Sequence, residues 1–131
     1  MPGQEMRLLL LATIGGALGS GARHLVNVGM TRAFGPHFPW ATLTVNVAGS
    51  FLMGLLVDMI LRRFGGSVEM RTFLATGILG GFTTFSAFSL DISNLIGRGD
   101  SASAMGYIVA SVALSLVALY AGLALSKALF S

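Results

Sequence analysis

The stretch GILGGFTTFSAFS, residues 77–89, decides the fold, because it lies inside an apolar segment yet disfavours a continuous helix. The pair Gly80 and Gly81 precedes Thr83 and Thr84, and glycine pairs beside hydroxyl residues favour a break in the backbone hydrogen-bond ladder. A helix broken at membrane depth frees carbonyl groups at the end of its first half and amides at the start of its second. Such backbone is tolerated only where protein or water covers it. The segment therefore predicts a broken membrane helix beside a polar path.

The composition indicates the surroundings that this chain is built for. Of its 131 residues, 54% are hydrophobic and only 10% are charged, with a mean hydropathy of +0.82. A soluble domain of this size carries more charge, so a lipid bilayer is the expected surrounding. The length allows about four helical spans and no second domain. We therefore expect a single integral membrane domain over residues 1–131, without bulky catalytic machinery.

Cysteine content and charge exclude several other classes of protein. The sequence has no cysteine, which excludes a disulfide scaffold, a thiol nucleophile and an iron–sulfur cluster. The net charge of +3 comes from eight Lys and Arg residues that are scattered among hydrophobic runs. Because they form no basic patch, we expect no nucleic-acid partner and interpret these residues as loop anchors.

Apolar runs predict transmembrane helices at about residues 8–30, 41–61, 72–96 and 103–129. The connection after the first run contains Pro36 and Pro39, which end a helix, and Trp40, which suits a membrane interface. The runs are too long for strands and lack alternation, so the predicted fold class is all-α, a four-helix transmembrane bundle with a broken third helix. A cleaved leader is the competing interpretation of the first run, but the hydrophobicity continues past Gly21.

The basic residues give a weak signal for orientation. One side of the membrane would carry Arg7, Arg62, Arg63, Arg71 and Lys127, and the other Arg23, Arg32 and Arg98. Five against three is a small positive-inside bias. A small protein with nearly balanced flanks can insert in either orientation, which would allow an antiparallel, dual-topology homodimer.

The polar chemistry inside the predicted spans is neutral. The acids lie in loops or near span ends, at Glu5, Asp58, Glu69, Asp91 and Asp100. A proton-coupled exporter of this size needs a buried carboxylate, so its absence argues against that class. Uncharged groups recur instead at helical spacing, with Thr42, Asn46 and Ser50 in the second span and Tyr107, Ser111 and Ser115 in the fourth. Such groups can replace part of an ion's water shell without holding the ion tightly.

Each of these residues also has a plainer explanation. Hydroxyl residues pack helices and hydrogen-bond across them in lipid, and packing is the commoner role for any one serine. Asn46 differs, because its amide has four hydrogen-bonding positions that are costly to leave unpaired. Gly15, Gly19 and Arg23 share one helix face, on which the glycines predict a small-residue packing seam. Arg23 either reaches lipid headgroups or lines a vestibule that attracts anions. Phe85 and Phe88 either pack in a core or present their positive ring edges to a small anion.

Three segments together resemble the CrcB/Fluc family of fluoride channels. They are GGALGSGARHL at residues 15–25, ATLTVNVAGSFLMG at 41–54 and GILGGFTTFSAFS at 77–89. The TTFS motif followed by a second Phe-Ser is specific, and the four-span layout covers nearly the whole chain. The resemblance implies a dual-topology homodimer with two parallel fluoride pathways, passive conduction and a central structural sodium ion.

The resemblance also implies a role for individual residues. Phe85 and Phe88 match the phenylalanines that line the pores, and Asn46 matches the asparagine beside them. Gly80 and Thr83 match the positions whose backbone carbonyls bind the sodium ion. The other polar positions of the pathway correspond to Arg23, Thr42, Ser86, Ser89, Tyr107, Ser111 and Ser115. Two departures alter the outer end of this polar track: Ala87 stands where threonine is common, and Asp91 where glutamate is usual.

The expected function is a multi-pass channel of the cell inner membrane that lets cytoplasmic fluoride leave passively, and not an enzyme. Fluoride as the particular anion follows from the resemblance, because spacing and composition do not separate it from chloride. A small proton-coupled multidrug or cation exporter shares the size and the possible dual topology, and a structural membrane subunit with packing glycines is a third possibility.

Overall fold

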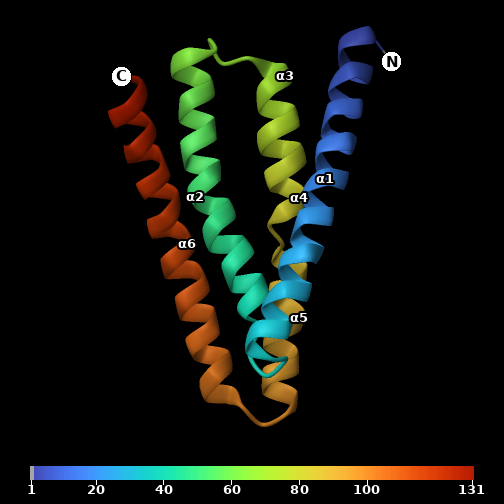
Figure 1. The fold of residues 1–131 in the computed structure, drawn as a ribbon, viewed down its shortest axis with the longest axis vertical. Coiled ribbons are helices and arrows are strands. Elements are labelled where there is room, and N and C mark those ends of the chain that lie inside the picture. The colour runs from blue at the N-terminus through green and yellow to red at the C-terminus, as the bar shows by residue number, and fades with distance from the viewer. Residues whose placement is uncertain (1) are drawn as a thin grey trace.

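The computed structural model describes residues 2–131 and contains four helical spans joined by short connections (Figure 1). Three spans are single helices: α1 (Gly3–Phe34), α2 (Trp40–Arg63) and α6 (Ser101–Phe130). The third span consists of α3 (Val68–Met70), η1 (Arg71–Leu79), α4 (Gly80–Phe82) and α5 (Phe85–Gly97). All four are long and apolar enough to cross a membrane, and residues 2–131 contain no strand. The all-helical fold with four apolar spans is confirmed, and each span begins earlier and ends later than predicted.

The four spans pack as two close pairs. In Figure 1, α1 lies along the third span, contacting η1 and α4, and α2 lies along α6. Glycines allow both contacts: a Cβ added at Gly19 would lie 2.0 Å from the carbonyl oxygen of Ile78, and one added at Gly122 would lie 2.1 Å from that of Phe51. The interpretation of the first span's glycines as a packing seam is confirmed. A second seam of the same kind joins α2 to α6.

The third span changes its backbone geometry twice. η1 is a π-helix, and the N–H of Gly80 at its end donates to the carbonyl of Ala75, five residues earlier. The backbone is then extended at Thr83 (φ −88°, ψ 158°) and at Thr84 (φ −154°, ψ 127°). α5 begins immediately afterwards, because Thr84 Oγ1 accepts the N–H of Ala87 at 3.1 Å and caps its first turn. Extended residues therefore lie near the middle of an apolar span.

The connection between α1 and α2 is packed onto the end of the bundle where α5 passes into α6. It turns at Gly35, whose φ of 79° favours glycine. The core beneath it is formed by Phe88, Leu95, Ala104 and Tyr107, which come from α5 and α6. Phe38 from the connection packs against this cluster. The loop is thus part of the folded core.

Candidate functional site

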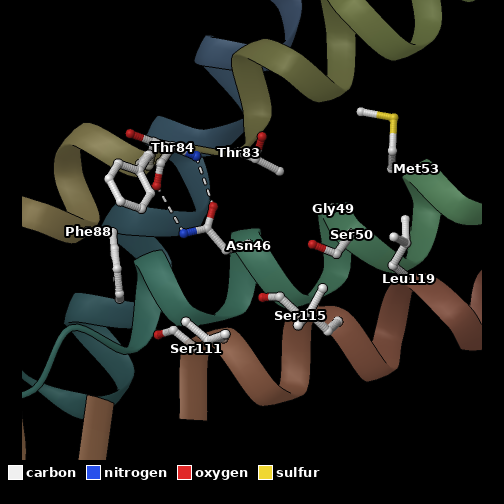
Figure 2. Close-up of a pocket in the computed structure, with 13 residues that line it drawn as sticks. Asn46, Gly49, Ser50, Met53, Thr83, Thr84, Phe88, Ser111, Ser115 and Leu119 are labelled. Carbon is white, nitrogen blue, oxygen red and sulfur yellow. Dashed lines mark hydrogen bonds between the residues drawn. The ribbon is translucent and has the colours of Figure 1, made fainter. Parts of the chain in front are cut away.

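Asn46 on α2 bridges the interruption between α4 and α5. Its Oδ1 accepts the backbone N–H of Thr84 at 2.8 Å, and its Nδ2 donates to the carbonyl of the same residue at 3.0 Å (Figure 2). A single side-chain amide therefore satisfies both backbone groups of Thr84, as a neighbouring strand would. Because unpaired backbone groups are costly away from water, this contact stabilises the extended residue inside the span.

The interruption leaves the carbonyl groups of residues 80–83 without their helical donors, and those of Gly80 and Thr83 are the ones that concern the predicted cation site. In a continuous helix the carbonyl of Gly80 would accept the N–H of Thr84, and the carbonyl of Thr83 would accept the N–H of Ala87. Here the first donor goes to Asn46 Oδ1 and the second goes to Thr84 Oγ1. The oxygen atoms of Gly80 and Thr83 are therefore free to accept another partner, such as a small hard cation.

A cavity of about 420 Å³ opens beside the interruption, between α2, α5 and α6. Its polar lining comes from Asn46, Ser50, Thr83, Thr84, Ser111 and Ser115, and none of its 13 lining residues is charged. Figure 2 shows the serines of α6 on the side of the cavity away from Thr83 and Thr84. Ser111 is only 6% exposed, and its hydroxyl has no hydrogen-bond partner within residues 2–131. That buried hydroxyl therefore keeps an unused hydrogen-bonding capacity beside the cavity.

Two phenylalanines line the same cavity, with ring centroids 5.5 Å apart. Phe88 is 7% exposed and packs against the ring of Tyr107 at 5.1 Å. Phe85 is 76% exposed on the surface of the single chain. One ring is therefore fixed in the core, whereas the other opens to whatever covers this face of the protein.

Arg23 lies at a second cavity, of about 240 Å³, which Thr42 also lines. Its Nε donates to the carbonyl of Gly81 at 3.1 Å, one residue after the glycine whose carbonyl is freed. The third span therefore holds the Arg23 side chain beside this cavity. Thr84 lines this cavity as well as the larger one, so the pair formed by Asn46 and Thr84 lies between them.

Asp91 is a carboxylate within α5, and it lines the 240 Å³ cavity and a neighbouring cavity of about 290 Å³. The hydroxyl of Tyr107, a residue with no exposed surface, donates to Asp91 Oδ2 at 2.8 Å. Tyr107 of the fourth span thus contacts the predicted polar pathway through its hydrogen bond to Asp91. The Asp91 carboxylate beside these cavities therefore has a hydrogen-bond donor in Tyr107.

The structure brings most of the predicted pathway residues together. Asn46, Phe85, Phe88, Ser111 and Ser115 line one cavity, and Arg23 and Thr42 line the adjoining one. Three predicted pathway residues line none of these three cavities: Ser86, Ser89 and Tyr107. The Ser86 hydroxyl is 3.3 Å from that of Thr84, and the Ser89 hydroxyl donates to the carbonyl of Phe85 at 3.0 Å.

Comparison with protein families matches residues 10–123 to the CrcB-like proteins, described as Camphor Resistance (CrcB). The chain belongs to the CrcB-like family. Its similar relatives include a fluoride-specific ion channel FluC of Rhizobium meliloti, 56% identical over 124 residues that span 95% of this chain and 99% of the relative. Proteins of the same name from Agrobacterium fabrum and Mesorhizobium japonicum are 54% and 53% identical, over 95% and 92% of this chain and 99% and 97% of theirs.

The sequence does not predict two features of this CrcB-like site. The first is the π-helical geometry of η1, for which residues 71–79 carry no local signal. The second is the pairing of Asn46 with Thr84. The only available signal was the hydrogen-bonding capacity of a buried amide, which indicates that a partner exists but not which one.

Proposed function

We propose that this CrcB-like protein is a fluoride-selective channel of the bacterial inner membrane that lets cytoplasmic fluoride leave down its gradient. The observation that carries the proposal is identity of 51–56% to proteins named fluoride-specific ion channel, over at least 91% of the chain. It is a passive transporter and not an enzyme.

The neutral 420 Å³ cavity supports an anion path. The unpartnered hydroxyl of Ser111 and the hydroxyl of Ser115 offer donors without a full charge, which favours brief binding over trapping. Phe85 and Phe88 add ring edges that carry partial positive charge. From this cavity an anion would pass the pair formed by Asn46 and Thr84 and enter the vestibule at Arg23, where the guanidinium favours negative charge.

We infer that the functional unit is an antiparallel, dual-topology homodimer with two pathways. The 76% exposure of Phe85 supports this, because a ring at the mouth of the cavity is open to a second copy. The nearly balanced basic residues, five against three, support insertion in both orientations. Tagged termini on intact cells would test this point, and detection of one orientation only would refute dual topology.

A structural sodium ion fits the oxygen atoms that the interruption frees. The carbonyls of Gly80 and Thr83 are suitable neutral ligands for a small hard cation, and both have lost their helical donors. Two oxygens from one chain are too few to replace a hydration shell, so these ligands require the same pair from a second copy. When bound, the ion would supply a fixed positive charge between the two copies.

Reconstitution tests the proposed function directly. Liposomes loaded with potassium fluoride or potassium chloride receive the purified protein, and efflux is followed with anion-selective electrodes after valinomycin addition. We expect rapid fluoride efflux with negligible chloride efflux. Efflux that requires a pH gradient would support a proton-coupled exporter instead, and absence of any ion flux would support a structural subunit.

A further inference from the structure

A row of five aromatic rings runs from the α1–α2 connection to the interruption of the third span. Successive centroids are 4.7 Å apart for Trp40 and Phe38, 5.5 Å for Phe38 and Tyr107, 5.1 Å for Tyr107 and Phe88, and 5.5 Å for Phe88 and Phe85. All four distances lie in the range of favourable aromatic pairs. The row therefore links the α1–α2 connection to the rings at the 420 Å³ cavity, through residues that are far apart in the sequence.

Phe38 is the ring that the connection contributes to this row. It meets Tyr107 nearly edge to face, at an interplanar angle of 85°, while Phe88 packs against the same tyrosine from α5. Tyr107 has no exposed surface, and its hydroxyl reaches Asp91 at 2.8 Å. Two aromatic neighbours thus pack against the Tyr107 ring, and removing Phe38 takes away one of the contacts that hold its hydroxyl near Asp91.

The connection itself is fastened at its centre. An Arg98 guanidinium nitrogen donates to the carbonyl of His37, which directly precedes Phe38. Within the connection, the N–H of Trp40 donates to the carbonyl of Phe38 at 2.8 Å. Pro36 and Pro39 restrict the backbone on either side. These contacts hold Phe38 over Tyr107 without any contact between Phe38 and the large cavity.

We propose that Phe38 is a positioning residue of the fluoride pathway, which acts by keeping the hydroxyl of Tyr107 on Asp91. This role rests on the proposed channel function. Asp91 lines two cavities on the vestibule side, where an unpaired carboxylate would repel an entering anion. The hydroxyl of Tyr107 donates to this carboxylate, and Phe38 keeps the tyrosine ring in the position that allows it. Its effect on fluoride passage is therefore indirect and requires the tyrosine hydroxyl.

The test uses the full-length protein in liposomes, with fluoride efflux measured for the wild type and each variant. Phe38→Leu is expected to lower efflux about tenfold, whereas Phe38→Tyr, which retains a ring, is expected to keep most of it. Phe34→Leu is the matched control: Phe34 also packs near Trp40, at 6.0 Å, but is 59% exposed and makes no aromatic contact with Tyr107. We expect efflux of this control to equal that of the wild type.

A double-mutant cycle distinguishes positioning from general packing. Tyr107→Phe keeps the ring and removes the hydroxyl, so Phe38→Leu should have little further effect in that background. Equal fold losses in both backgrounds would overturn the proposed role, as would Phe38→Leu matching the Phe34→Leu control. If Phe38→Leu does not assemble, Arg98→Ala takes its place, because it removes the hydrogen bond to the His37 carbonyl without changing any of the five rings. Its fold loss of efflux is then compared with and without Tyr107→Phe. A wild type without fluoride efflux would refute the channel function and this role together, whereas a conducting wild type leaves the cycle to decide the role alone.

Discussion

Gly19 is the position where the contact between α1 and the third span is tightest. A Cβ added there would lie 2.0 Å from the carbonyl oxygen of Ile78 and 2.9 Å from the backbone nitrogen of Phe82. Ordinary contact begins at 3.4 Å, so Gly19→Ala requires the two segments to separate by about 1.4 Å. Both neighbours are backbone atoms, which cannot rotate out of the way. The separation would also move Arg23, one turn further along α1, beyond hydrogen-bond distance of the Gly81 carbonyl.

The expected cost of Gly19→Ala is about 3 kcal/mol, the upper end of the usual range for overpacking, because rigid backbone takes up the strain. Thermal denaturation in detergent, followed by gel filtration, should show a midpoint about 10 °C lower than that of the wild type. Fluoride efflux should fall as well, since the interruption at Gly81 is displaced.

Gly21→Ala on the same helix is the control for Gly19→Ala. A Cβ at Gly21 meets nothing within 4 Å, and both variants gain the same intrinsic helix propensity of alanine. The difference between the two variants therefore isolates the clash with the third span. If Gly19→Ala denatures within about 2 °C of Gly21→Ala and conducts fluoride equally well, the close packing of these segments is refuted.

Three further predictions concern the cavity and a helix end. Phe85→Ile or Phe88→Ile should lower fluoride efflux severely while the variants assemble normally, because bulk is kept and the ring edge is lost; normal efflux in both would exclude the aromatic role. Asn46→Asp should destabilise the protein by about 2 kcal/mol and impede fluoride, because a carboxylate oxygen would replace the amide donor facing the Thr84 carbonyl; unchanged melting and efflux would contradict this. Hydrogen bonds from Ser103 lower the pKa of Asp100 below its usual 3.8, so its contribution to stability is present at neutral pH and is lost as the pH falls through that lowered value. Asp100 is the N-cap of α6, where its side chain accepts the N–H of Ser103. Between about pH 6 and about pH 3, Asp100→Asn should therefore lose less thermal stability than the wild type, and an equal loss would argue against this cap.

The sequence predicts the fold well because hydropathy determines it. Long apolar runs must form helices in lipid, and prolines and charged residues mark where these runs end. The glycines of the first span also predict a packing seam correctly, since close helix contact in lipid has few other solutions. The sequence does not predict which helices pair, because α1 meets η1 through residues some 60 positions apart.

The candidate site is predictable in its composition and less so in its connections. A face formed by Thr42, Asn46 and Ser50 follows from helical periodicity alone. The partner of Asn46 does not follow, because Thr84 lies 38 residues away and offers backbone groups that any residue would offer. The π turns of η1 also escape prediction, since no residue type in 71–79 specifies a hydrogen bond to the fifth preceding carbonyl.

The two departures from the CrcB/Fluc pattern lie close together in the structure, and this proximity limits their effect. Ala87 and Asp91 are one turn apart on α5 and line the same 240 Å³ cavity. The backbone at Ala87 is held whichever side chain stands there, because its N–H donates to Thr84 Oγ1. A cavity of this size admits water, which needs polar partners, and the side chains of Asp91 and Thr42 are both in its lining. The shorter carboxylate of Asp91 is still reached by the hydroxyl of Tyr107 at 2.8 Å. The proposed polar track can therefore continue past both departures, provided that the tyrosine ring stays where its aromatic neighbours hold it.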